Sequence, residues 1–334
     1  MSGAISPGGN DARSPIGGSR PQELLGASFL TVLLIVSFFA VPLLGTVALP
    51  FAAVPTVRLT HRRGLPAGLG ASALAAGLLG LVGAASGGLS AAFAGAFLAC
   101  LVAAAPACFA GAVRRGLEPS RAYLALCAAG YAILTGGLIL GSPEGRPAVR
   151  EEIRRSFEGF RSAAIQSYGK AGMDDPETIA RLKDTLQKAE GFATRFWAGL
   201  AGASWVLASA IGFYTGARLA RPAASAEAVR FESLYNPPAL AALFVVSGAG
   251  VVLGPPVAQE IAGDLLLPLC ALYFLGGLSI MCHFARKRIR ATLWRAGLYA
   301  LVLYFPINAG VALVGLFDWY ADFRKRNERT IQSS

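Results

Sequence analysis

The side chains that could bind a ligand inside this chain are few and mostly uncharged. Three of them, Tyr273, Tyr304 and Asn308, lie in long apolar segments of the C-terminal third. Hydroxyl and amide groups in such segments either bind a ligand or form hydrogen bonds between helices, because an unsatisfied polar group is costly in apolar surroundings. Asn308 follows Pro306 by two residues, and a proline frees a backbone carbonyl that a nearby amide can satisfy. A ligand site and an interhelical hydrogen bond both remain open.

No catalytic or metal-binding signature accompanies these residues. The chain has no G-x-x-x-x-G-K-[ST] loop for a nucleotide, no H-E-x-x-H and no G-x-S-x-G. Its two histidines lie beside basic segments, and its five cysteines lie in apolar stretches without C-x-x-C spacing. The apolar segments also lack central carboxylates of the kind that carry protons or sodium ions. We therefore expect a chain that is not an enzyme and that needs no metal ion and no cofactor.

The elements that must position the polar residues are membrane helices. Of the 334 residues, 54% are hydrophobic and only 15% are charged, whereas soluble domains carry about 25% charged residues. The mean hydropathy is +0.54. This composition excludes an ordinary soluble domain and indicates an all-α, polytopic integral membrane protein in contact with the lipid bilayer. The net charge of +11 fits the basic loops of such a protein, so we expect no nucleic-acid binding.

Apolar segments close to the ~20 residues that cross a bilayer recur along the chain. From these segments we expect about eight to ten transmembrane helices. The absence of Lys and Arg from the middle of the segments supports this interpretation, because a charge at the centre of a bilayer is costly. The segments are Ala27–Leu44, Thr46–Val57, Leu65–Ala85, Leu89–Val113, Ala122–Leu140, Phe196–Ala217, Pro238–Leu253, Ile261–Phe284 and Leu293–Phe317.

Basic residues alternate between successive connections. Four connections carry arginine clusters, whereas the turns at Gly87-Gly88 and Gly254–Glu260 carry no Lys or Arg. Basic loops stay in the cytoplasm, so we expect these four connections and the N-terminus on the cytoplasmic side of the inner (cytoplasmic) membrane. The side of the C-terminus stays open, because a kink or hairpin at Pro306 would change it.

Composition divides the chain into five regions: 1–25, a disordered tail; 26–141, transmembrane helices; 142–195, an amphipathic helical insert; 196–320, further transmembrane helices; and 321–334, a basic tail. In the insert, Asp175, Pro176 and Glu177 predict a helix start with an N-cap, a proline at the first position and an acidic first turn. The order of the spans places the insert outside, although it holds ten Lys and Arg. It is either a structural cap or a lid over a ligand.

Short motifs near both ends carry a resemblance to a known family. A first apolar hairpin contains two motif residues, span eight contains a Gly-Gly-Leu sequence, and the last span ends in a G-x-x-D-x-x-x-D-F-R stretch. The motif residues are Pro42, Gly45, Gly277, Gly315, Asp318, Asp322, Phe323 and Arg324. With these motifs the chain resembles the YybS-like family of predicted bacterial membrane proteins over most of residues 25–326.

That family is distantly similar to the substrate-binding S components of energy-coupling-factor vitamin transporters. The resemblance implies a helical subunit that captures a small molecule and needs a separate ATPase as its coupling partner. We therefore predict a non-enzymatic subunit of a transport system that binds a small hydrophilic or aromatic molecule. The alternative is a membrane scaffold or assembly factor that acts through its basic cytoplasmic loops and its C-terminal tail.

Overall fold

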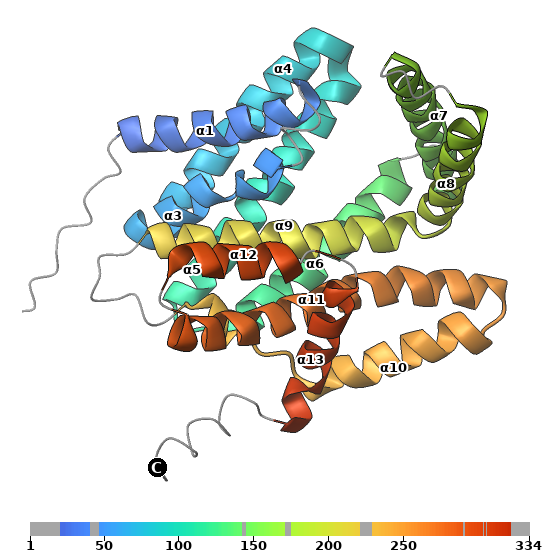
Figure 1. The fold of residues 1–334 in the computed structure, drawn as a ribbon. Helices are drawn as coiled ribbons and strands as arrows, with labels where there is room; N and C mark the ends of the chain where they lie inside the picture. The colour runs from blue at the N-terminus through green and yellow to red at the C-terminus, as the bar shows by residue number, and fades with distance from the viewer. Residues whose placement is uncertain are drawn as a thin grey trace, which may run out of the picture.

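In the computed structural model, all the regular secondary structure of the described residues is helical, as the composition predicts (Figure 1). These residues are 21–40, 47–141, 145–170, 175–220, 229–289, 291–302, 304 and 306–321. The α-helices are α1 (Pro21–Ala40), α3 (Val54–Arg63), α4 (Leu65–Ala99), α5 (Ala105–Arg114), α6 (Pro119–Gly141), α7 (Arg146–Lys170), α8 (Pro176–Arg195), α9 (Trp197–Leu219), α10 (Pro238–Leu253), α11 (Pro256–Arg288), α12 (Thr292–Val302) and α13 (Ile307–Ala321). Three short turns join them: the 3-10 helices η1 (Leu49–Phe51) and η4 (Phe231–Ser233), and the π-helix η2 (Cys100–Ala104).

Among the described residues, fewer helical stretches are long and apolar enough to cross a membrane than the sequence predicts. Within the described ranges, five helical stretches are long and apolar enough, or six when the bent pair α12 and α13 counts as one span. The expected eight to ten is therefore too high for full-length spans. α10 has 16 residues, or about 24 Å, which is less than the ~30 Å hydrocarbon core. Residues 47–57, the described part of the expected segment Thr46–Val57, include η1 and the start of α3 and form no span.

The longest of the five stretches, Leu65–Arg114, folds back on itself. Gly88 interrupts α4 with φ 75° and ψ −160°, a conformation that residues other than glycine rarely adopt. The two arms then pack closely, since a Cβ at Gly95 would lie 2.8 Å from the carbonyl oxygen of Leu79. The turn predicted at Gly87-Gly88 is thus present, and it separates two apolar arms.

The C-terminal helices break where the sequence has a proline. α12 and α13 meet at 92°, with Pro306 directly before α13. The chain therefore bends at the position where a kink or hairpin was expected at Pro306. At the other end of the chain, α1 begins at Pro21, inside the region expected to be a tail.

α9 and α11 both run between two ends of the bundle that differ in charge. At one end, Arg62 Nε donates to the carbonyl oxygen of Ala220 at 3.2 Å, and Arg114 donates to a carbonyl oxygen of α3 at 2.8 Å. Arg286 of α11 pairs there with Glu232 at 2.7 Å. The predicted basic connections thus meet at one end, which we call the basic end. α7 and α8 stand at the opposite end, the insert end (Figure 1).

α7 and α8 are the amphipathic helices predicted for the insert, and they pack on each other. The predicted start of α8 is confirmed, because the Asp175 carboxylate accepts a hydrogen bond from the backbone N–H of Thr178 at 3.0 Å. Ion pairs between successive turns also form on α8, with Lys188 and Asp184 2.7 Å apart. Local sequence therefore determines how this hairpin begins and how its surface is charged.

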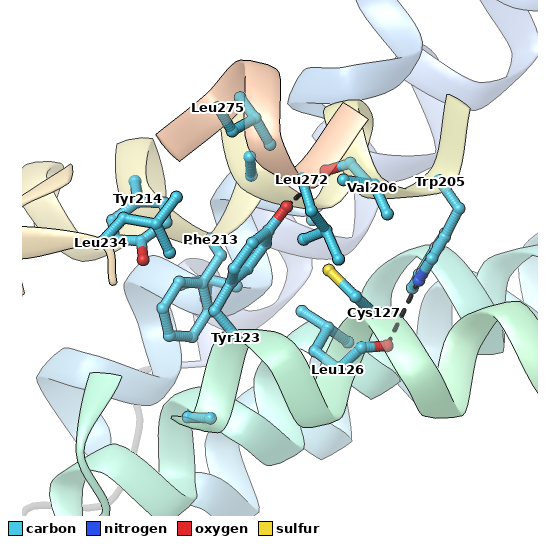
Figure 2. Close-up of a cluster of buried hydrophobic side chains, with 14 of the residues drawn as sticks. Tyr123, Leu126, Cys127, Trp205, Val206, Phe213, Tyr214, Leu234, Leu272 and Leu275 are labelled. Atoms are coloured by element: carbon cyan, nitrogen blue, oxygen red, sulfur yellow. Dashed lines mark hydrogen bonds between the residues drawn. The ribbon is translucent and has the colours of Figure 1, made fainter. Parts of the chain in front are cut away.

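The largest buried cluster lies between α6, α9 and α11 (Figure 2). The Tyr123 side chain is fully buried, and its hydroxyl donates to the carbonyl oxygen of Val206 at 2.6 Å. The indole N–H of Trp205 donates to the carbonyl oxygen of Leu126 at 3.2 Å. These bonds satisfy the polar atoms of the core aromatic residues. They hold α6 against α9 in one register, which in turn positions the residues of α9 that face α11.

Two glycines let α9 approach the N-terminal helices. A Cβ at Gly212 would lie 2.6 Å from the Cβ of Ala53, and a Cβ at Gly216 would lie 2.7 Å from the Cβ of Val57. Small residues four positions apart allow such approach between membrane helices. α3 thereby packs on α9 and joins the N-terminal half of the bundle to the C-terminal half.

Candidate functional site

The candidate site is a groove between α9, α11 and α13, with α10 contributing one side chain. Its volume is about 800 Å³, which is in the range of small-molecule sites. We call it the α11–α13 groove. Its lining residues are Ala203, Leu207, Phe244, Leu267, Cys270, Ala271, Tyr273, Phe274, Asn308, Ala309, Ala312, Leu313 and Leu316.

Two motif glycines determine how α13 crosses α11. A Cβ at Gly277 would collide with the carbonyl oxygen of Val311, and a Cβ at Gly315 would collide with the carbonyl oxygen of Tyr273. Only residues without a side chain let two helix backbones approach this closely. The two glycines therefore have a packing role, which is to hold α13 against α11 beside the groove.

The structure brings two of the three predicted ligand residues together. The Tyr273 side chain is 2% exposed, and the Phe244 ring packs edge-on against it at 5.4 Å. Asn308 is half-buried in the first turn of α13 and lines the same groove. Tyr304 is 68% exposed and does not belong to the groove lining. Its hydroxyl is therefore a natural comparison for the hydroxyl of Tyr273.

The Tyr273 hydroxyl is buried and has no hydrogen-bond partner among the residues that the structure describes. Leaving a buried hydroxyl unsatisfied costs about 1–3 kcal/mol. Buried polar groups in native proteins are nearly always satisfied by protein, water or a ligand. The groove thus has an apolar wall, and one of its lining residues carries a buried hydroxyl that no described residue satisfies. It fits a molecule with an aromatic or apolar body and one polar group.

A second polar cluster joins the insert to the bundle. The Asp264 carboxylate of α11 is 7% exposed and lies 2.7 Å from Arg146 of α7. It also accepts a hydrogen bond from the backbone N–H of Gly199 at 2.9 Å, while the Tyr131 hydroxyl donates to the Asp264 carbonyl oxygen at 3.0 Å. Gly199 is in the first turn of α9, whose N-cap residue Phe196 makes no side-chain cap. Asp264 therefore supplies the cap that the local sequence of α9 lacks.

This cluster was not predicted from the sequence. Arg146 and Asp264 are 118 positions apart. No feature of the neighbouring sequence indicates that they are partners. The available signal in the sequence was that Asp264 is an acidic residue at the end of an apolar segment, while the insert contains many basic residues. The cluster holds the hairpin of α7 and α8 at a fixed place on the insert end.

The remaining motif residues do not join the groove. Asp318 is half-buried in the last turns of α13 and does not line the groove. Pro42, Gly45, Asp322, Phe323 and Arg324 lie outside the described residues. Among the described residues, no three His, Cys, Asp or Glu side chains gather in a group that could hold a metal ion.

The surface of the bundle is apolar where a bilayer would surround it. Large side chains such as Phe29, Leu81, Phe93 and Val245 are 65–69% exposed. Exposure of this extent is unfavourable in water and favourable against acyl chains. The helices and their surface define a multi-pass membrane protein.

The chain belongs to the family described as predicted membrane protein (DUF2232), whose family model matches residues 29–319. The resemblance to a family of predicted membrane proteins is confirmed at that level. No curated protein matches the chain. No solved structure matches it either. The comparisons show no link to transporter S components.

Proposed function

We propose that this protein is a non-enzymatic subunit of a transport system in the cytoplasmic membrane, and that it binds a small molecule in the α11–α13 groove. The observation that carries the proposal is the buried Tyr273 hydroxyl, which lacks a partner among the described residues beside a cavity of about 800 Å³. The lining favours an aromatic ligand over a strongly hydrophilic one, because few polar groups could replace the water that the ligand loses.

A separate ATPase would supply the energy for transport. The sequence has no nucleotide-binding loop of its own. Dependence on such a partner is also what similarity to S components implies. The bound molecule would then enter the groove from one side of the membrane and leave after the partner acts.

The test is to purify the protein from its native membranes in mild detergent and to identify everything that stays bound by mass spectrometry. We expect a stoichiometric small molecule and an ATPase subunit. Tyr273→Phe keeps the ring and removes the hydroxyl, so retention of the molecule should fall about fivefold to tenfold. Tyr304→Phe is the matched control, because it removes the same group from a 68% exposed position outside the groove.

Three results would count against the proposal. Retention of phospholipids alone would mean that the groove holds no specific small molecule. Equal loss in Tyr273→Phe and Tyr304→Phe would mean that the Tyr273 hydroxyl makes no contact with the molecule. A stoichiometric protein partner without an ATPase would instead favour the scaffold alternative.

A further inference from the structure

A second cavity, of about 540 Å³, lies at the basic end of the bundle. Three arginines line it: Arg218 in the last turn of α9, Arg230 directly before η4, and Arg286 in the last turn of α11. The aromatic rings of Tyr214 and Phe231 form part of its wall, packed edge-on at 5.4 Å. We call this cavity the arginine pocket. It shares no lining residue with the α11–α13 groove.

The arginine pocket has a positive net charge. Among the described residues that line it, three are arginines and one, Glu232, is acidic, so these four side chains carry a formal charge of +2. The Glu232 side chain is 14% exposed and pairs with Arg286 at 2.7 Å. The charged side chains that line the described part of the pocket are therefore mostly basic, which favours anions.

Lining a common pocket distinguishes these three arginines from the other basic residues at the basic end. Arg58 and Arg115 are exposed residues of the same basic end, yet neither lines the pocket. The three pocket arginines come from separate elements and converge over an apolar wall. Guanidinium groups match phosphate oxygens in geometry and charge. An apolar wall beside them suits carbon atoms that are attached to a phosphate.

We propose that the arginine pocket binds a phosphate group that carries an apolar substituent. The position suits an anionic phospholipid, because basic pockets between helices at this level of the membrane meet lipid headgroups. A soluble organic phosphate has the same chemistry. The two sources differ in whether the acyl chains contribute to binding.

The experiment uses the full chain in a neutral detergent and native mass spectrometry. The probes are phosphatidylglycerol, phosphatidylcholine as its zwitterionic counterpart, and inorganic phosphate. The pocket variant Arg218→Gln/Arg230→Gln is compared with Arg58→Gln/Arg115→Gln, which removes the same charge from the same end. We expect phosphatidylglycerol to bind more tightly than phosphatidylcholine. The pocket variant should weaken that binding at least about tenfold, while the control stays within about twofold.

The outcomes separate the two sources and test the site itself. Loss of phosphatidylglycerol binding in the pocket variant alone assigns the site to a lipid headgroup. Loss of inorganic phosphate binding in that variant, without preference for the lipid, assigns it to a soluble phosphate. Equal losses in both double variants, or no binding of either anion to the wild type, would overturn the proposal. If the double variant fails to fold, Arg218→Gln alone replaces it, because Arg218 is exposed at the end of α9.

Discussion

Replacing Asp264 by alanine should destabilise the protein through a single, well-defined contact set. The change removes the carboxylate that binds Arg146 at 2.7 Å and Gly199 N–H at 2.9 Å. A hydrogen bond to a charged group contributes about 1.5–3 kcal/mol. Because the Arg146 side chain is 35% exposed, solvent weakens its ion pair with Asp264, and we assign that pair only the ~1 kcal/mol of a surface ion pair. The orphaned N–H in the first turn of α9 adds its own cost, so we expect a loss of about 3 kcal/mol.

The assay is unfolding of the purified protein in mixed micelles with increasing sodium dodecyl sulfate, followed by circular dichroism. Two other acidic residues with more exposed side chains serve as comparisons, and replacing them should cost less stability. Glu260 pairs with Arg150 at 2.6 Å and is 29% exposed, so Glu260→Ala should cost about 1 kcal/mol. Asp184 is 62% exposed in its pair, so Asp184→Ala should cost less than about 0.5 kcal/mol. An Asp264→Ala variant as stable as Asp184→Ala would refute the capping role of Asp264.

Three further changes test the packing of the bundle by thermal unfolding in detergent. Gly277→Ala should cost about 1–3 kcal/mol, because its Cβ meets main chain of α13, whereas Gly297→Ala meets nothing within 4 Å and should be nearly neutral. Gly88→Ala should cost about 1 kcal/mol through its φ of 75°, while Gly77→Ala, in open space within α4, should be neutral or slightly stabilising. Tyr123→Phe loses a buried 2.6 Å hydrogen bond to α9 and should cost about 1 kcal/mol. Equal midpoints within either glycine pair, or an unchanged midpoint for Tyr123→Phe, would contradict these contacts.

Features with a local cause could be predicted from the sequence. Asp175 is the N-cap of α8 because a short acidic side chain followed by proline satisfies the first free N–H groups of a helix. Gly88 marks a reversal because glycine accepts a positive φ. The break beside Pro306 has the same kind of cause, since proline cannot continue the hydrogen bonding of a preceding helix. The length of each span was less predictable, because helices such as α10 are apolar throughout yet stop short of a full crossing.

Features with a non-local cause could not be predicted. Tyr273 and Asn308 are recognisable as polar groups in apolar segments, but their common groove depends on how closely α11 and α13 approach. That approach is decided by two glycines 38 positions apart, Gly277 and Gly315, and glycine pairs are frequent in so glycine-rich a chain. The pairing of Arg146 with Asp264 is non-local in the same sense. Only the folded arrangement of α7, α9 and α11 brings these charges together.

Filling the α11–α13 groove tests most directly whether it holds a small molecule. Ala309 is exposed and lines the groove, whereas the next residue, Gly310, does not line it and has open space at its Cβ position. The measurement is the amount of bound small molecule per protein, by native mass spectrometry, in Ala309→Trp and in Gly310→Trp. We predict that Ala309→Trp loses the molecule and that Gly310→Trp retains it at the wild-type ratio. Retention of the molecule by Ala309→Trp at the wild-type ratio would contradict a binding site in this groove.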